Sequence, residues 1–234
     1  MNEQERILWS LERHGRRYND WLLERASPLG PRVLEVGAGI GTFTIPLGER
    51  GLTITAIEPE GELAAILEGR VRDLANVDVR RDDVLELTPD TLGGPIDSIL
   101  CFNVLEHIPD DAGALASMQA CLRPGGRLFL LSPAHPFLFG ETDRAVDHQR
   151  RYTRDGLNER FVDAGFEVDD LRYVNPVGAA GWLVSSRLLK RRTLPTGPLS
   201  LFGRLVPVLR LLDGLRLPFG LSLWAVGRAT RPIG

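Results

Sequence analysis

Short apolar runs alternate along the chain with segments in which apolar residues recur at helical spacing. Strands separated by helices are typical of parallel sheets, so the pattern predicts an α/β fold. The predicted strands are residues 32–36, 53–57, 77–80, 98–102, 127–132, 166–174 and 221–228. The predicted helices are 41–50, 61–73, 110–122 and 153–164, preceded by one or two amphipathic helices within 3–26.

Three further stretches complete this pattern. Residues 85–92 form a loop or a short helix, and Pro124-Gly125-Gly126 predicts a turn into the next strand. Roughly 45 residues separate the last two strands, far more than a hairpin needs. They contain two apolar stretches of helical character, 178–189 and 199–215.

Composition narrows the classes of protein. The chain has 234 residues, a net charge of −3 and a pI of about 5.9, so no general basic field favours nucleic acid. Cys101 and Cys121 are too few and too badly spaced for a metal site, and we expect no metal. The charged start of the chain has no apolar signal core, and no run suits a membrane span, so we expect a cytoplasmic protein.

The first predicted strand runs into a turn with glycine at three alternate positions, Gly37, Gly39 and Gly41. A Cβ there would block both a tight turn and the close approach of a ligand to the backbone. Glu58 stands about 20 residues later, at the end of the next apolar run, where a carboxylate can accept hydrogen bonds from ribose hydroxyls. The two features together predict a nucleotide-like ligand.

A dinucleotide is the first alternative ligand. Its fingerprint requires glycine at the first, third and sixth positions of the turn. Here Thr42 occupies the sixth position and glycine falls at the fifth, and we find no site for hydride transfer. The spacing therefore disfavours a nicotinamide dehydrogenase.

Five segments in order resemble the class I S-adenosylmethionine-dependent methyltransferases. They are residues 33–41 (VLEVGAGIG), 56–59 (AIEP), 81–84 (RDDV), 103–109 (NVLEHIP) and 122–127 (LRPGGR). Residues 131–175 also resemble a largely bacterial branch of the family, through a Pro-Ala-His loop followed by the pattern Asp-x-x-x-Asp-His-x-Arg-Arg-Tyr.

The resemblance implies a Rossmann-like, seven-stranded, mostly parallel sheet flanked by helices, with the seventh strand antiparallel. It divides one domain, 1–234, into a helical lid (1–30), a cofactor-binding core (31–134), an acceptor loop followed by a helix and the sixth strand (135–175), a helical insert (176–218) and the last strand with a tail (219–234). The implied cofactor is S-adenosyl-L-methionine, which leaves as S-adenosyl-L-homocysteine.

The resemblance also assigns the cofactor contacts. Glu58 would hold the ribose hydroxyls, Asp83 the adenine amino group and the Val84 amide a ring nitrogen, while Asn103 and Val104 would border the methionine and the sulfonium. Asp82 is the poorer candidate for adenine. The complete predicted set is Glu35, Gly37, Ala38, Gly39, Gly41, Glu58, Pro59, Asp83, Val84, Asn103 and Val104.

Methyl transfer to a hydroxyl or an ammonium group requires a proton to leave the acceptor, which favours a nearby base. His148 and His135 are the candidates, and we favour His148 because an acid, Asp147, stands beside it in the sequence. The alternative is that this segment is a structural network. His107 is expected to belong to the scaffold of the cofactor loop.

Two segments keep two interpretations each. Tyr18 and Trp21 form part of a lid over the cofactor or pack against the sheet. The apolar insert roofs the acceptor pocket or forms a homodimer face, and its Arg187, Lys190, Arg191 and Arg192 meet an anionic or membrane-borne acceptor or form a solvated helix end.

The predicted function is methylation of a small-molecule acceptor, with oxygen ahead of nitrogen and a glycosyl or secondary-metabolite compound as the acceptor class. A non-catalytic S-adenosylmethionine-binding or partner protein is the alternative. A nucleic-acid methyltransferase is disfavoured by the acidic pI and by Asn103-Val104-Leu105-Glu106, which differs from the Asn-Pro-Pro-Tyr type of motif.

Overall fold

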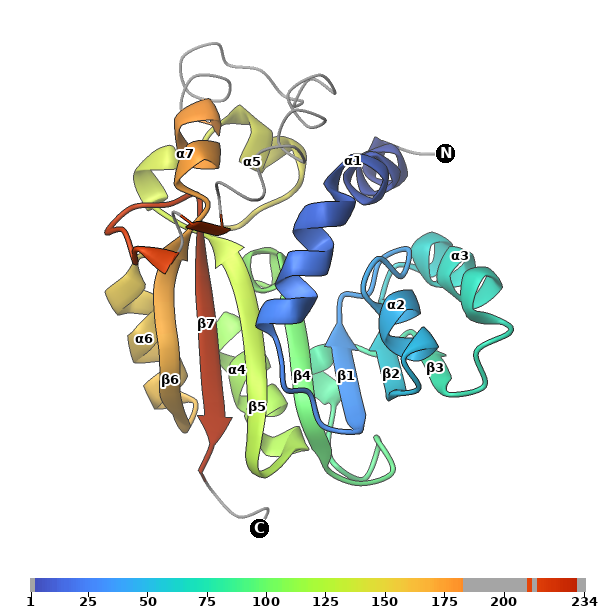
Figure 1. The fold of residues 1–234 in the computed structure, drawn as a ribbon. Helices are drawn as coiled ribbons and strands as arrows, with labels where there is room; N and C mark the ends of the chain where they lie inside the picture. Colours follow the sequence, from blue (N-terminus) through green and yellow to red (C-terminus); the bar gives the residue numbers. More distant parts are fainter. Residues whose placement is uncertain (1–2, 183–209, 212–213, 231–234) are drawn as a thin grey trace.

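The computed structural model describes residues 3–182, 210–211 and 214–230. A seven-stranded sheet runs through it in the order β3-β2-β1-β4-β5-β7-β6 (Figure 1). β7 is antiparallel to both β5 and β6, and the other neighbouring strands are parallel. This arrangement confirms the predicted fold class.

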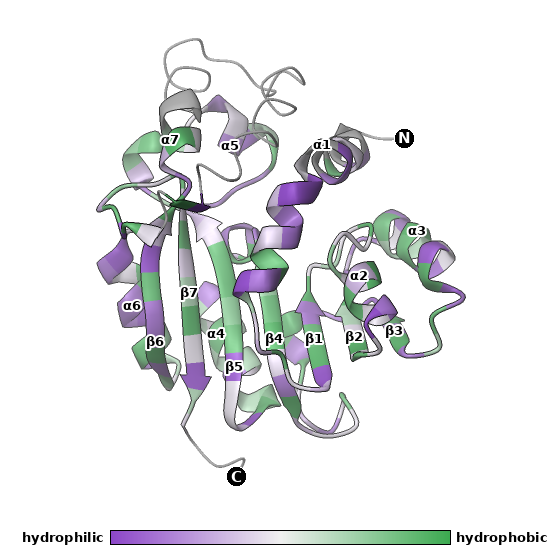
Figure 2. Ribbon diagram, in the orientation of Figure 1, coloured by the Kyte–Doolittle hydropathy of each residue, from purple (hydrophilic) through white to green (hydrophobic). Residues whose placement is uncertain are grey.

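The strands lie close to their predicted positions. They are β1 Arg32–Val36, β2 Thr53–Ile57, β3 Val77–Arg80, β4 Ile96–Phe102, β5 Leu122–Pro133, β6 Phe166–Val174 and β7 Ser222–Ala229. Each central strand is an apolar run because both of its faces are covered by helices. Figure 2 accordingly shows the middle of the sheet as largely hydrophobic.

Seven α-helices lie in the described part of the chain. They are α1 Glu3–Arg25, α2 Thr44–Glu49, α3 Gly61–Val71, α4 Asp111–Cys121, α5 Glu141–Ala145, α6 Arg154–Asp163 and α7 Pro176–Trp182. α1, α2 and α3 supply Leu22, Leu47 and Leu67 to the hydrophobic core on one face of the sheet. α4 and α6 supply Leu115 and Phe161 to the core on the other face.

Three predictions of local structure differ from the observed elements. Pro124-Gly125-Gly126 lies inside β5, because Leu122 already pairs with Ile96; the glycines form an irregularity there, with Gly125 at φ +77°. The segment after β5 is not only a loop, since it contains α5 and the short 3-10 helix Pro136–Leu138. α2 begins at Thr44, because the glycine turn occupies the residues before it.

The predicted insert lies mostly outside the described residues. Within it the structure describes α7, which begins two residues before the predicted start at 178. The remainder of the predicted helix 178–189, most of 199–215, and the four basic residues Arg187, Lys190, Arg191 and Arg192 are not described. Among the described residues, no helix combines the length and hydropathy needed to cross a bilayer.

The topology determines where a ligand can bind. β1 and β4 are neighbours in the middle of the sheet, and the strand order reverses between them. In open α/β sheets, ligands bind beyond the carboxyl ends of the strands at such a reversal. The loops after β1, β2, β3, β4 and β5 therefore lie at one edge of the sheet, which we call the carboxyl edge. These loops contain every predicted site residue except two. Glu35 lies within β1, and His148 lies between α5 and α6.

Candidate active site at the carboxyl edge of the sheet

The glycine turn after β1 has the backbone that its sequence predicts. Gly37, Gly39 and Gly41 have φ values of +69°, +55° and +90°, the left-handed region that favours glycine. A Cβ on Gly37 would lie 2.4 Å from Val104 Cγ2, and one on Gly41 would lie 2.5 Å from Leu67 Cδ1. The turn is therefore packed closely between the loop after β4 and helix α3.

Glu58 lies directly beneath this turn, at the end of β2. Its Oε2 accepts a hydrogen bond of 2.7 Å from the Gly39 amide, and its Oε1 accepts one of 3.0 Å from the Glu60 amide. Burial raises the pKa of the carboxyl group, and the two amides oppose that rise. Each oxygen keeps a further lone pair, so the side chain is fixed in place and can still accept two hydrogen bonds from a ligand.

Glu35 lies within β1 rather than in the turn. It is 3% exposed, and Thr44 Oγ1 donates a 2.5 Å hydrogen bond to its Oε2. Burial is the main cause that raises the pKa of Glu35 to about 8. The structure thus places Glu35 as a buried support beneath the turn, and its direct contact with a cofactor stays a prediction.

The loop after β3 separates the two neighbouring aspartates. Asp83 is exposed, and its Oδ1 accepts a 3.0 Å hydrogen bond from the Leu85 amide, while Val84 is buried. Asp82 forms a 2.5 Å ion pair with Arg80. Asp83 has an uncommitted carboxylate oxygen in the described part of the chain, which fits the preference for it over Asp82.

The loop after β4 brings two more predicted residues to the glycine turn. Asn103 has φ +54°, and its amide donates a 2.7 Å hydrogen bond to the Leu131 carbonyl of β5. Val104 follows and packs against Gly37. Ala38 is buried in the turn, and Pro59 is exposed beside Glu58. Every predicted cofactor residue thus lies at or just beneath the carboxyl edge.

Next along this loop is a cluster that the sequence did not predict, formed by Glu106, His107 and His148. One ligand-type atom from each side chain lies within 4.8 Å of the other two. Glu106 is completely buried, and burial raises its pKa to about 7; Ser132 Oγ donates a 2.8 Å hydrogen bond to its Oε2. The His107 and His148 rings meet edge to face at 4.7 Å. Burial lowers the pKa of His107 to about 4.

The carboxylate that orients His148 is Asp143, not the adjacent Asp147. His148 Nδ1 lies 2.9 Å from Asp143 Oδ1, which also accepts a 2.7 Å bond from Arg151 Nε. Asp147 is exposed and has φ +58°. The expectation that the neighbouring acid tunes His148 was therefore wrong, because a left-handed turn intervenes and the partner comes from α5.

His135 has a different environment. Its ring stacks between Tyr173 and Phe219, with centroid distances of 4.6 Å to each. Its Nε2 is buried, with no hydrogen-bond partner among the described residues, and burial lowers its pKa. Both candidate histidines lie at the carboxyl edge, but only His148 has a carboxylate partner.

Sequence reasoning missed Glu106, Asp143, Arg151 and Ser132 as parts of the site. Asp143 and Arg151 both fall within the Asp-x-x-x-Asp-His-x-Arg-Arg-Tyr pattern, so the pattern contained the signal. Arg151 also donates a 3.1 Å hydrogen bond to the Ala134 carbonyl, which ties the His148 segment to the end of β5.

Helix α1 contacts the glycine turn through its first half. A Cβ on Gly39 would meet Leu8 Cδ1 at 3.5 Å, and Arg70 of α3 joins Glu12 at 2.7 Å while stacking on Trp9 at 4.7 Å. Trp21 is buried and packs with Tyr18, which is partly buried and packs against the core beneath α1. The contacts of these two aromatic residues favour packing against the sheet.

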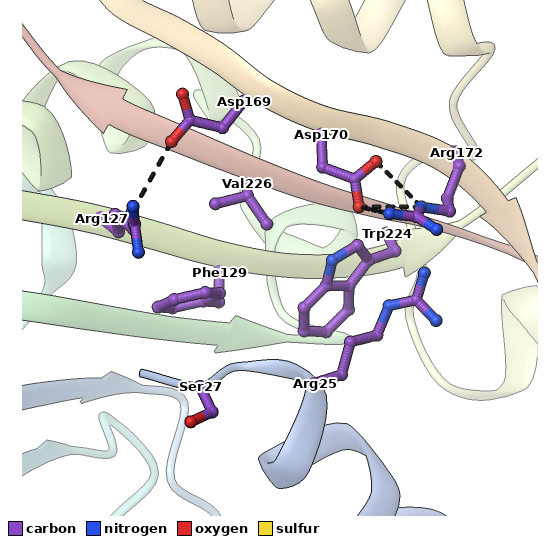
Figure 3. Close-up of a pocket in the computed structure, with 9 residues that line it drawn as sticks. All are labelled: Arg25, Ser27, Arg127, Phe129, Asp169, Asp170, Arg172, Trp224 and Val226. Atoms are coloured by element: carbon purple, nitrogen blue, oxygen red, sulfur yellow. Dashed lines mark hydrogen bonds and ion pairs between the residues drawn. The ribbon is translucent and has the colours of Figure 1, made fainter. Parts of the chain in front are cut away.

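A hollow on the face of the sheet that carries α1 is separate from this site. Its lining is Arg25, Ser27, Arg127, Phe129, Asp169, Asp170, Arg172, Trp224 and Val226 (Figure 3). Arg172 pairs with Asp170, and Arg127 lies 3.6 Å from Asp169. These charges neutralise one another, and none of the predicted site residues lines the hollow.

The residues that form this edge of the sheet match a known protein family. A family model described as "Methyltransferase domain" matches residues 11–171, which span the glycine turn, Glu58 and the His148 segment. The chain belongs to the methyltransferase domain family. Membership confirms the resemblance to class I S-adenosylmethionine-dependent methyltransferases.

Relatives and solved structures agree with this assignment. The chain is 33% identical over 114 residues to a ubiquinone biosynthesis O-methyltransferase of Xanthomonas axonopodis, a match covering 47% of this chain and 46% of the relative. The chain thus matches about half the length of such curated relatives.

Two solved structures share the fold. A putative methyltransferase complexed with the Trm112 activator of Haloferax volcanii aligns with a TM-score of 0.68 at 17% identity, covering 97% of this chain and 94% of the other. Magnesium protoporphyrin IX methyltransferase from Synechocystis, solved with bound SAM, gives 0.57 at 14% identity, over 96% and 82% of the two chains.

Proposed function

We propose that the chain binds S-adenosyl-L-methionine at the carboxyl edge and transfers its methyl group to an oxygen of a small-molecule acceptor. The observation that carries this proposal is Glu58, whose two carboxylate oxygens are each fixed by one backbone amide and each keep a lone pair. A ribose presents two adjacent hydroxyl donors, which match this arrangement. The methyltransferase relatives support the choice of donor.

The other residues fit the remaining parts of the cofactor. The turn at Gly37, Gly39 and Gly41 brings bare backbone to the ligand, and glycine adopts these angles without the strain that a Cβ would add. Asp83 offers an oxygen to the adenine amino group, and Asn103 and Val104 border the methionine part. The first half of α1 closes over the turn, which supports a lid within 1–30.

When bound, the cofactor supplies an already activated methyl group, so the protein mainly positions the acceptor and excludes water. The acceptor oxygen must also lose its proton. We place this step at the cluster of Glu106, His107 and His148, which is mostly shielded from solvent; Glu106 and His107 lie in the same loop as Val104. His148 is our first candidate to contact the acceptor, because Asp143 fixes its ring. His135, stacked between aromatic rings, is the second.

Oxygen is preferred over nitrogen as the methylated atom because the curated relatives are O-methyltransferases. The acceptor class stays a proposal: a hydroxylated small molecule such as a phenol or a glycosyl compound. Contact with a membrane or a second copy through 176–218 rests on residues outside the described part.

The test is transfer of a labelled methyl group from S-adenosyl-L-methionine to a panel of phenols, catechols, glycosides and amines. We expect a labelled product with at least one hydroxylated acceptor, and H148N should lower kcat by about 10²-fold or more, the scale of lost acid–base assistance. D147N is the matched control and should keep activity. Labelling of amines alone would contradict transfer to oxygen, and cofactor binding without any product would favour the non-catalytic alternative.

A further inference from the structure

Glu106, His107 and His148 form a set of metal-ligand side chains that the proposed methyl transfer does not by itself require. Their ligand-type atoms lie within 4.8 Å of one another. Glu106 and His107 come from the loop after β4, and His148 comes from the segment after α5. The Gln149 amide joins the two segments by a 2.8 Å hydrogen bond to the Glu106 carbonyl.

A buried oxygen within this set has no hydrogen-bond partner among the described residues. Glu106 is 0% exposed, and its Oε1 accepts no hydrogen bond among the described residues. His148 Nε2 lies 3.8 Å from that oxygen, which is beyond hydrogen-bond distance. An unsatisfied carboxylate oxygen is costly in a protein interior, so something else must stabilise it.

Glu106 and His148 each have a second polar atom that is fixed by a neighbouring side chain. Ser132 Oγ donates to Glu106 Oε2 at 2.8 Å, and Asp143 Oδ1 lies 2.9 Å from His148 Nδ1. A histidine that donates one ring N–H to a carboxylate presents its other nitrogen as a lone pair, which is the usual arrangement of metal-binding histidine. The free Glu106 Oε1 and the His148 Nε2 lone pair therefore lie across a short gap from each other.

We propose that Glu106, His107 and His148 bind a divalent transition-metal ion, with Zn²⁺ as the preferred ion. Two imidazoles and one carboxylate suit zinc better than magnesium or calcium, which favour oxygen ligands alone. Three protein ligands leave a fourth position open for water or an acceptor oxygen.

The geometry allows such an ion with small movements. Zn–N and Zn–O bonds of about 2.0–2.1 Å place tetrahedral ligand atoms roughly 3.3 Å apart, so ligand atoms that lie within 4.8 Å of one another must approach by up to about 1.5 Å. His107 and His148 are only partly buried, which gives an ion a path to the carboxylate. From the sequence we expected no metal, and the proposed site differs from that expectation. The sequence does not reveal the site because its three residues come together only when the segment 135–152 folds against the loop after β4.

The role of the ion rests on the proposed function. An acceptor hydroxyl at the open position would have its pKa lowered by the ion and would lose its proton before it attacks the methyl group. The proton passes to solvent water, and His148 acts as a ligand instead of as the base. The deprotonated oxygen then bonds to the methyl carbon as the sulfur–methyl bond breaks, and S-adenosyl-L-homocysteine leaves.

The test measures metal binding on the full chain after chelator treatment and dialysis. Calorimetry with Zn²⁺ should show one equivalent, and Co²⁺ should give a visible absorption band on binding. E106Q and H148N should each weaken Zn²⁺ binding at least about 100-fold, and D143N about 10-fold to 100-fold. D147N is the control and should bind as the wild type does.

Two results would overturn the proposal: no Zn²⁺ binding by folded wild-type protein, or binding unchanged in both E106Q and H148N. Preference for Mg²⁺ over Zn²⁺ would also contradict it, because imidazole ligands would not produce that order. S-adenosyl-L-homocysteine titrated into the metal-free protein separates the two proposals. If the protein binds S-adenosyl-L-homocysteine but does not bind Zn²⁺, the metal site alone is removed. If it binds no S-adenosyl-L-homocysteine either with or without Zn²⁺, the proposed function is removed.

Discussion

Two independent constraints act on Gly37. Its φ of +69° disfavours any residue with a Cβ, and a Cβ there would also lie 2.4 Å from Val104 Cγ2. Gly51 offers a matched comparison, since its φ is +82° but nothing lies within 4 Å of a Cβ built on it. Comparing alanine substitutions at the two positions therefore separates the cost of backbone strain from the cost of steric overlap.

We therefore predict that G37A destabilises the protein more than G51A. G51A should lower the unfolding free energy by about 1 kcal/mol, the cost of alanine in the left-handed region, and G37A by about 2–4 kcal/mol because overpacking adds to it. Urea unfolding of both variants measures the difference. Equal losses would show that Val104 moves aside freely and that the turn is not closely packed.

Glu35 makes stability depend on pH. Burial raises its pKa from 4.5 to about 8, so the folded state keeps a proton that the unfolded state releases. Its contribution to stability is present below pH 4.5 and is lost as pH rises towards 8, with a slope of up to about 1.4 kcal/mol per pH unit.

E35Q should remove this slope, since glutamine stays neutral and its amide oxygen can still accept from Thr44. Urea unfolding at pH 5, 6, 7 and 8 should show the variant gaining on the wild type at each step. E49Q changes an exposed glutamate and should run parallel to the wild type. An E35Q curve that also runs parallel would contradict a protonated Glu35.

Single residues differed in how far the sequence revealed them. Glu58 could be predicted from the sequence, because its spacing from the glycine turn along the chain is set by one strand–helix–strand unit, which has a regular length. The partner of His148 could not be predicted, because the fold brings Asp143 to it across five residues, whereas the adjacent Asp147 is exposed in a left-handed turn. Glu106 was not predicted as a site residue, since nothing in a linear sequence shows that its oxygen faces a histidine from a later segment.

Helix α1 is connected to the glycine turn and to α3 through the side chain of Arg70. Arg70 of α3 donates through Nη1 to the Ile40 carbonyl at 2.5 Å and holds Glu12 of α1 with both nitrogens. One side chain thus connects the turn, α1 and α3. Its loss should loosen α1 over the turn without disturbing the core.

We predict that R70M weakens S-adenosyl-L-homocysteine binding by about 3-fold to 10-fold, the scale of a partly buried ion pair with a further hydrogen bond. R72M, an exposed arginine on the turn after α3, should bind as the wild type does. Calorimetry on both variants is the measurement. Equal affinities for R70M and wild type would remove α1 from the closure of the cofactor site.

At the level of elements, strands were predicted better than helix ends. β1, β2, β3 and β6 match their predicted bounds, and β1 and β2 do so because each is a short, largely buried run with breakers on both sides. α5 escaped prediction because it is short and polar, and it is held by hydrogen bonds such as Asp143 Oδ2 to the Gly140 amide rather than by an apolar stripe. Contacts of Asp143 with the later residues His148 and Arg151 also hold that helix, and no apolar stripe marks it in the sequence.

Across the whole molecule, parallel topology gathers residues from 35 to 148 at one edge, and the two hydrophobic cores keep the strands beneath it in register. The antiparallel direction of β7 was expected only from family resemblance, because a short, mostly apolar run carries no sign of strand direction. The order of strands therefore explains both the cofactor cradle and its closeness to the Glu106 cluster.

The central claim is that Glu58 and the glycine turn hold the cofactor, and calorimetric titration with S-adenosyl-L-homocysteine tests it most directly. We predict one equivalent bound by the wild type and by E49Q, and an affinity loss of about 10-fold to 100-fold in E58Q, since a charged acceptor of ribose hydroxyls becomes a neutral one. No binding by the folded wild type, or equal affinity in E58Q, would contradict the account.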